Sequence, residues 1–121
     1  MKAKVLHLVL NAMADLPGVE GCALVEIEAG MVWHTAGQMQ GMQNLAEAVS
    51  DYWRLYTRLD HHFTEIGELK ASIFIHAKGK LTLLPCGKGM LLVAMASQRA
   101  KVDWNQWQDK AKDLAKMVDL L

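Results

Sequence analysis

The chain has 121 residues, 52% of them hydrophobic, and its 13 Lys and Arg side chains balance its 13 Asp and Glu side chains. This length predicts one domain over residues 1–121 with a real hydrophobic core, and it excludes two domains of ordinary size. The formal net charge of zero argues against recruitment to nucleic acid or to an anionic membrane by charge alone.

A first helix is predicted over about residues 3–15, and Leu16-Pro17-Gly18 ends it. Its apolar residues recur at helical spacing, at Val5, Leu8, Val9, Ala12, Met13 and Leu16. A secretory signal fits less well, because the apolar run VLHLVL is short and His7 interrupts it. Elsewhere the apolar runs fall far short of the ~20 residues that cross a bilayer. We therefore expect a cytoplasmic protein without membrane insertion.

Two strands are predicted next, over residues 22–28 and 31–35, joined by a turn at Glu28-Ala29-Gly30. The connection AGQMQGMQN follows. Its Met39 and Met42 carry flexible thioethers that suit adaptable partner contacts, although a plain mobile loop is the commoner explanation.

A long second helix is predicted from Asn44 to about Phe63, with Asn44 and Glu47 spaced as a capping box. Its apolar residues span about half of the circumference, wider than the ~100° stripe that one sheet face needs. They are Leu45, Ala46, Ala48, Val49, Tyr52, Trp53, Leu55, Tyr56, Leu59 and Phe63. Either this helix lies deep in a monomer core, or it also contacts a second chain. We favour the second interpretation.

Three further strands are predicted over residues 69–76, 80–84 and 90–96. A last helix begins at Asp103, which can cap it through Gln106, and its inner face comprises Trp107, Ala111, Leu114 and Val118. The order is α-β-β-α-β-β-β-α. Since short turns between strands require antiparallel pairing, the predicted fold is α+β, with helices on both faces of a five-stranded antiparallel sheet.

The segment HAKGKLTLLPCGKG contains two Gly-Lys pairs, so a phosphate-binding loop was considered. Such a loop follows the pattern G-x-x-x-x-G-K-[ST] and opens a helix. Phe74 stands where its first glycine belongs, and Leu81 stands where Ser or Thr belongs. The second pair runs into the strand-like stretch MLLVAMA. Both pairs are therefore predicted to be hairpin turns.

The stretches LPGVEGCALVEIEAGMVWHTAG and ELKASIFIHAKGKLTLLPCGKGMLLVAMA, each after a helix, resemble the Roadblock/LC7 domain family from about Val5 to Val118. The resemblance implies a sheet order 2-1-5-4-3, a homodimer or heterodimer, and a scaffold or regulator of small Ras-like GTPases. The family often has Asp-Gly between its first two strands, where this chain has Ala29-Gly30. Longin and profilin-like folds are alternatives with the same layout.

In that strand order the segment KASIFI lies at the edge of the sheet, is apolar on both faces and contains no proline. An exposed edge of this kind invites uncontrolled pairing, which a twin chain would prevent. We therefore predict a homodimer in which the third strands pair beneath two packed copies of the second helix. The predicted interface residues are Ala46, Val49, Trp53, Tyr56, Ser72, Ile73, Phe74 and Ile75.

No catalytic residue, cofactor-binding residue or metal ligand is predicted. Cys22 and Cys86 are expected to be reduced. The fifth strand would lie between the strands that carry them, which places the two thiols beyond the reach of a disulfide bond. Cys86 and His76 would lie on the order of 15 Å apart, too far for a nucleophile and its base. Adjacent His61 and His62 lack a third ligand at metal-binding spacing.

Three function classes follow. The first is a non-enzymatic dimeric scaffold that binds or regulates a small Ras-like GTPase, and the alternatives are a small-molecule-sensing or general protein-interaction module and an enzyme. We favour the scaffold because of the family resemblance and because no nucleophile, carboxylate pair or metal set is evident. The predicted partner-binding residues form a polar stripe on the second helix, Glu47, Asp51, Arg54 and Arg58.

Overall fold

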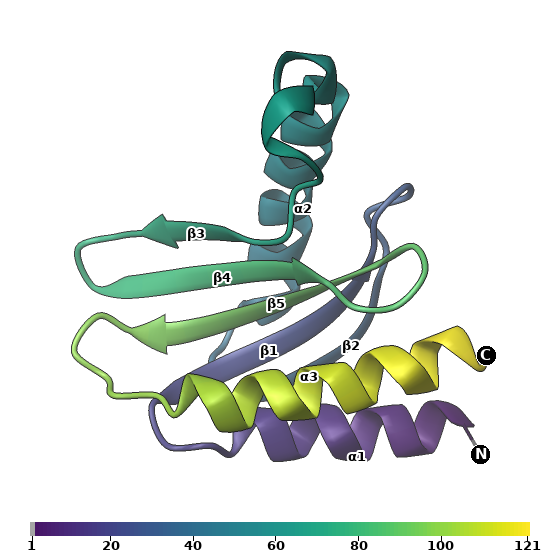
Figure 1. Ribbon diagram of the computed structural model, residues 1–121. Helices are drawn as coiled ribbons and strands as arrows, with labels where there is room; N and C mark the ends of the chain where they lie inside the picture. The colour runs from purple at the N-terminus through teal and green to yellow at the C-terminus, as the bar shows by residue number, and fades with distance from the viewer. Residues whose placement is uncertain (1) are drawn as a thin grey trace.

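The computed structural model describes residues 2–121, and its helices and strands follow the predicted order (Figure 1). Their bounds are α1 (Lys2–Ala14), β1 (Val19–Glu26), β2 (Val32–Gly37), α2 (Met42–Arg58), β3 (Ser72–Ile75), β4 (Gly79–Pro85), β5 (Met90–Ser97) and α3 (Trp104–Asp119). Two short 3₁₀ helices, Asp60–His62 and Thr64–Ile66, follow α2.

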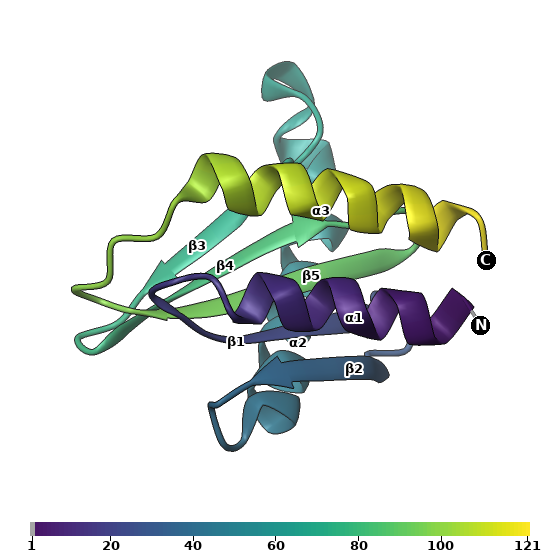
Figure 2. The same cartoon turned by 90° about the horizontal axis from the view of Figure 1, so that it is seen from below.

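The strands form one five-stranded sheet in the order β2-β1-β5-β4-β3, and every adjacent pair is antiparallel. This is the predicted fold class and the predicted strand order. Helices α1 and α3 lie side by side on one face, and α2 crosses the other face (Figures 1 and 2). The central strands β1 and β5 are therefore covered on both sides, which explains why both are almost continuously buried.

A separate hydrophobic core fills each side of the sheet, because successive side chains of a strand point to opposite faces. Under α1 and α3, the central residues include Leu10, Leu24, Leu92 and Trp107. Under α2, the buried residues are Ala23, Val25, Met42, Ala46, Val49, Trp53, Leu81, Leu83, Leu91 and Val93. The sheet thus separates two apolar layers, each of which a helical layer closes.

The inward face of α1 differs from the predicted one. Leu6, Leu10 and Met13 are buried, whereas Val5 and Leu8 are 44% and 59% exposed. The first helix is apolar on more than one side, so its spacing also fits a face at i, i+4 and i+7. The outer apolar residues, Val5, Leu8, Val9 and Ala12, line a groove beside α3.

The second helix begins two residues earlier and ends five residues earlier than predicted. Its N-cap is Gly41, which has a φ of 77° and makes no side-chain cap hydrogen bond, so Asn44 and Glu47 do not form the predicted capping box. Beyond Arg58 the chain continues in the two 3₁₀ helices. Glycine adopts this left-handed backbone conformation without a Cβ clash, which explains the earlier start.

The last helix matches its prediction closely. The Asp103 carboxylate accepts a hydrogen bond from the Gln106 backbone N–H at 3.1 Å, as an N-cap residue does. The predicted inner face, Trp107, Ala111, Leu114 and Val118, is buried throughout.

The hairpin of β1 and β2 contains an irregularity that the sequence did not predict. Leu24 pairs with His34, but the next residue, Val25, pairs with Val32. Trp33 is consequently an extra residue opposite the junction of Leu24 and Val25, as in a β-bulge.

Candidate partner-binding surfaces

Helix α2 presents three sides, of which only one is buried against its own sheet. The buried side contains three of the predicted interface residues, Ala46, Val49 and Trp53, which are 0%, 7% and 4% exposed. They contact residues of the second core. Within one chain these side chains are therefore already packed, and a second copy would meet their exposed neighbours.

We define the apolar flank of α2 as Tyr52, Leu55, Tyr56 and Leu59, which are 59%, 48%, 40% and 42% exposed. Of these only Tyr56 was among the predicted interface residues. The helical periodicity had already placed the other three in the apolar arc, but it could not show how the helix is rotated on the sheet. The Tyr52 ring lies against the Phe74 ring of β3, with 5.6 Å between centroids.

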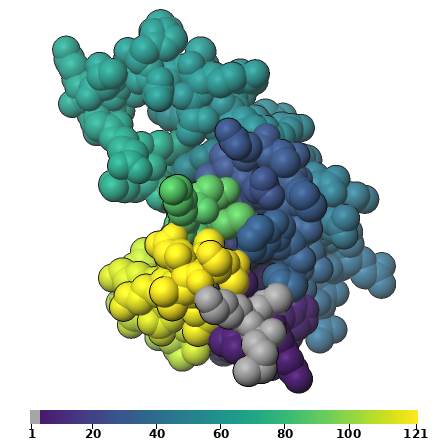
Figure 3. Space-filling view, turned by 90° about the vertical axis from the view of Figure 1, so that its right-hand side faces the viewer, coloured from purple at the N-terminus to yellow at the C-terminus, as the bar shows by residue number. Residues whose placement is uncertain are grey.

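The C-terminal part of α2 projects past the β3 edge of the sheet (Figures 1 and 2). In Figure 3 this projecting part, in teal, forms the upper end of the molecule, above the green β4–β5 turn. A cavity of about 810 Å³ lies here, and its lining includes Trp53, Tyr56, Phe63 and Pro85. Tyr56 stacks on Phe63 with 4.9 Å between ring centroids. The helix thus extends beyond the sheet that supports it, with aromatic rings along its side.

Strand β3 is an edge strand, because among the described residues only β4 is hydrogen-bonded to it. Ser72 and Phe74 pair with Leu83 and Leu81, so they face α2, and both are half-buried. Ile73 and Ile75 point toward the α3 side and are 57% and 70% exposed.

The polar flank of α2 consists of Glu47, Asp51, Arg54 and Arg58, as predicted, but Arg54 also has a role within the chain. Its guanidinium donates to the Ile27 carbonyl oxygen at 3.0 Å and to Ser50 Oγ at 3.2 Å. It also forms an ion pair with Asp51. Arg54 therefore ties α2 to the turn between β1 and β2, which leaves it less able to contact a partner.

Arg58 and Glu47 lie on either side of this tether. Arg58 is exposed, and the ion pairs of the described residues do not include it. Glu47 is exposed and accepts a 3.4 Å hydrogen bond from Gln43. A cleft of about 480 Å³ between α2 and the β1–β2 turn is lined by Ile27, Glu28, Asp51, Arg54, Thr57 and Arg58. Three of the four predicted partner-binding residues therefore share one charged cleft.

Both cysteines are free, as predicted, and the structure shows that both are also buried. Burial raises the pKa of the Cys22 thiol to about 12, although the Trp107 side chain partly opposes this shift. Burial and the nearby Asp119 carboxylate raise the pKa of the Cys86 thiol to about 12. A nucleophilic cysteine needs a thiolate, so neither thiol is activated for catalysis at neutral pH.

The His61 and His62 rings lie 4.0 Å apart at the projecting end of α2. Across the part of the chain that the structure describes, no three His, Cys, Asp or Glu side chains are grouped to hold a metal ion. Met42, which the sequence placed in a connection, is a buried residue of α2, and Met39 packs beside it. Within residues 2–121, no helix has the length and apolar character needed to cross a bilayer.

The fold is shared with several solved structures. MglB from Myxococcus xanthus has 18% sequence identity and a TM-score of 0.78, over 98% of this chain and 87% of that one. A structure titled as MglB with a tetrameric arrangement has 17% identity and a TM-score of 0.82, over 98% and 91% of the two chains. A Roadblock/LC7 domain from Streptomyces avermitilis has 19% identity and a TM-score of 0.72, over 94% and 92%.

At the level of sequence, no protein-family model matches the chain. No curated protein matches it either. The structural similarities, at less than 20% identity, establish that the chain has the Roadblock/LC7 fold.

Proposed function

We propose that this chain is a non-enzymatic scaffold that forms a homodimer and binds or regulates a small Ras-like GTPase. The Roadblock/LC7 fold supports this proposal, because the resemblance seen in the sequence implies that class of function. The observation that carries it is the exposed apolar surface that runs from the apolar flank of α2 to the edge strand β3.

In the proposed dimer, β3 pairs with its twin and the apolar flanks of two α2 helices pack together. This arrangement would remove the free edge of the sheet and cover the exposed tyrosine and leucine side chains. It would also support the end of α2 that projects past β3. The tetrameric arrangement of one similar MglB structure supports oligomerisation in general.

The proposed GTPase-binding surface is the polar flank of α2, doubled by the dimer. Its four charged residues comprise two acidic and two basic side chains. A mixed-charge surface of this kind provides specificity and register more than affinity. Since the Arg54 guanidinium is hydrogen-bonded to the Ile27 carbonyl oxygen, we expect Arg58 and Asp51 to contact the partner.

The proposal that the chain is not itself an enzyme is supported by its buried thiols, whose raised pKa values suppress thiolate formation at neutral pH. It is also supported by the two Gly-Lys turns. Gly79 begins β4, and Gly87-Lys88-Gly89 connects β4 with β5, so neither opens a helix as a phosphate loop does.

The function can be tested by purifying the tagged chain from an extract of its own cells and identifying the bound proteins by mass spectrometry. We expect a small GTPase, and calorimetry with GTP and Mg²⁺ should detect no nucleotide binding to the scaffold alone. Asp51→Lys combined with Arg58→Glu should weaken GTPase binding, whereas Lys112→Glu, at an exposed position on α3, should not.

Nucleotide binding by the scaffold alone would contradict the proposal, as would GTPase binding that survives both charge reversals. Recovery of a metabolite without a protein partner would instead favour the small-molecule-sensing alternative. The cavity of about 810 Å³ beside the end of α2 is the observation that keeps this alternative in view, because its size is typical of ligand pockets.

A further inference from the structure

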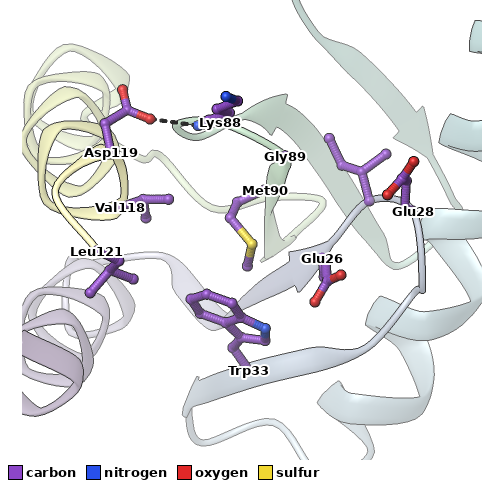
Figure 4. A pocket seen from close by; sticks show the side chains of 10 residues that line it. Glu26, Glu28, Trp33, Lys88, Gly89, Met90, Val118, Asp119 and Leu121 are labelled. Atoms are coloured by element: carbon purple, nitrogen blue, oxygen red, sulfur yellow. Dashed lines mark hydrogen bonds between the residues drawn. The ribbon is translucent and has the colours of Figure 1, made fainter.

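A second cavity lies on the other face of the sheet, where α3 ends. Its volume is about 770 Å³, and its walls come from the end of β1, the β1–β2 turn, the start of β2, the start of β5 and the end of α3 (Figure 4). This size falls in the range of small-molecule and side-chain binding pockets, roughly 300–1,000 Å³. Its lining includes none of the proposed dimer-interface residues, and it shares only Ile27 and Glu28 with the charged cleft beside the polar flank of α2.

An indole ring forms one wall of this cavity because of the β-bulge. Bulges re-aim side chains, and here the extra residue, Trp33, is directed into the cavity beside Met90 (Figure 4). Met90 is buried, whereas Trp33 is 39% exposed. The structure therefore places a large aromatic ring on an apolar base and leaves part of the ring uncovered.

The charged residues of the cavity are predominantly acidic. Glu26 pairs with Met90 across the β1–β5 ladder and shares its face of the sheet, and Glu28 follows in the turn. The ion pairs of residues 2–121 include neither glutamate. Asp119 contributes a third carboxylate, which accepts a 2.6 Å hydrogen bond from the Lys88 backbone N–H. Lys88 lies at the end of the cavity away from Trp33 (Figure 4).

The end of α3 adds to this negative character. The backbone dipoles of a helix sum to a partial negative charge at its C-terminus, and α3 ends at Asp119 on the wall of the cavity. The carboxylates of Glu26 and Asp119 and a helix C-terminus thus surround one lysine, while Glu28 lies at the edge of the cavity away from Trp33 (Figure 4). A ligand of this cavity would be a cation that also has a flat apolar face for Trp33.

We propose that this cavity binds a guanidinium group, stacked on Trp33 and hydrogen-bonded to the carboxylate of Glu26. Guanidinium is planar, stacks on aromatic rings and pairs with a carboxylate through two parallel hydrogen bonds. An ammonium group is a compact point charge that has neither the flat face nor the paired donors. The chain already contains one cation over an indole, since Lys80 Nζ lies 5.3 Å from the centre of the Trp104 ring. This proposal does not depend on the GTPase proposal.

The guanidinium could belong to an arginine side chain of a protein partner or to a free small molecule, and two probes distinguish these sources. One is N-acetylarginine amide, and the other is a short uncharged peptide with a central arginine. Tighter binding of the peptide identifies a protein segment as the ligand. Equal affinity identifies a free guanidinium compound.

Binding can be followed by ¹H–¹⁵N NMR of the tryptophan indole N–H groups, with the Trp33 signal assigned from its loss in Trp33→Phe. We expect a saturable shift of the Trp33 signal with either arginine probe, while the Trp104 signal, already next to Lys80, stays in place. N-acetylcitrulline amide, which is neutral and of similar shape, should cause no such shift.

Glu26→Gln should weaken binding by about tenfold or more, because the charged hydrogen bonds to its carboxylate are lost. The matched control is Glu20→Gln, an exposed glutamate near the other end of β1, which should leave binding unchanged. Equal shifts with citrulline and arginine would overturn the proposal. So would full affinity in Glu26→Gln, or the absence of a saturable shift with both arginine probes.

Discussion

The Tyr52 ring on α2 packs against the Phe74 ring on the edge strand β3, with 5.6 Å between their centroids. This contact joins the apolar flank of the helix to the free edge of the sheet. Tyr52 remains 59% exposed despite it, and Phe74 is only half-buried on the same face of the sheet. The two elements therefore present a continuous apolar surface, and the first prediction concerns what covers it.

The wild-type chain should form a dimer, with about twice the mass of one chain in light scattering at micromolar concentration. Tyr52→Glu combined with Leu55→Glu should give a folded monomer, because both side chains are exposed in one chain and would become buried charges in the dimer. Leu8→Glu is the control, since Leu8 is 59% exposed on α1 at the opposite face. A wild-type mass equal to that of one chain in this measurement would contradict the prediction.

Trp53→Ala should destabilise the chain itself by about 3–5 kcal/mol, as expected for truncation of a large buried aromatic side chain. Trp53 is 4% exposed and packs in the core beneath α2. The measurement is chemical denaturation in the monomeric background, so that dimer dissociation does not contribute. In the same monomeric background, Leu59→Ala should lower the free energy of unfolding far less than Trp53→Ala does, because Leu59 is 42% exposed. Equal costs would mean that the apolar flank is buried within one chain.

Much of the fold could be predicted because short turns between strands permit only antiparallel pairing, and α3 carries one clear apolar face with a capping aspartate. The rotation of α1 and α2 could not be predicted. Both helices are apolar over more of their circumference than one sheet face covers, so the sequence pattern fits several rotations. As a result, Leu8 was expected inside, and the pattern did not show that Trp53 is buried in the core beneath α2 within one chain.

Two features of the candidate sites have no sequence signature. The Arg54 side chain donates a hydrogen bond to the backbone carbonyl of Ile27. Because every residue has a backbone carbonyl, the residue type at position 27 does not predict this contact. The bulge at Trp33 arises from a change of register between two strands, which the alternation of side chains in either strand does not reveal. The polar stripe was predictable, but its internal tether was not.

Arg54→Ala should destabilise the chain by about 1–3 kcal/mol, because charged hydrogen bonds to Ile27 and Ser50 are lost. It should also speed hydrogen exchange at Gly30, which lies beneath the guanidinium in the β1–β2 turn. Arg58→Ala is the matched control one turn along the helix, and it should change stability by less than about 0.5 kcal/mol. Similar effects of both variants would show that the tether contributes nothing.

Both cysteines should resist alkylation in the folded chain at neutral pH and react fully after unfolding. Thiols react as thiolates, and burial raises the pKa values of Cys22 and Cys86 to about 12. Since these pKa values lie above the ordinary thiol value of 9.0, the associated stability is fully present below pH 9.0 and is lost as pH rises toward 12. Free-thiol titration of the unfolded chain, purified without reductant, should count two thiols, and a count of zero would reveal a disulfide.

The ring of His34 on β2 meets the His7 ring of α1 edge-on, with 5.2 Å between the ring centroids. Burial, and to a smaller extent the nearby His7, lower the pKa of His34 below its usual 6.5. The folded chain therefore prefers neutral His34, so this contribution to stability is present above pH 6.5 and is lost as pH falls through the lowered value.

His7→Gln should raise the pKa of His34 only part of the way to 6.5, because it removes the charge of the neighbour while the larger cause, burial, remains. NMR titration of the His34 Cε1–H resonance measures this directly. His76→Gln, an exposed histidine beyond the end of β3, is the control and should leave the titration unchanged. If the pKa of His34 returned fully to 6.5 in His7→Gln, His7 and not burial would be the main cause of the lowered pKa. If the pKa did not change, His7 would make no contribution to it. A partial rise should also make unfolding by acid begin at a lower pH, since a smaller difference between the folded and unfolded pKa values leaves less stability to lose.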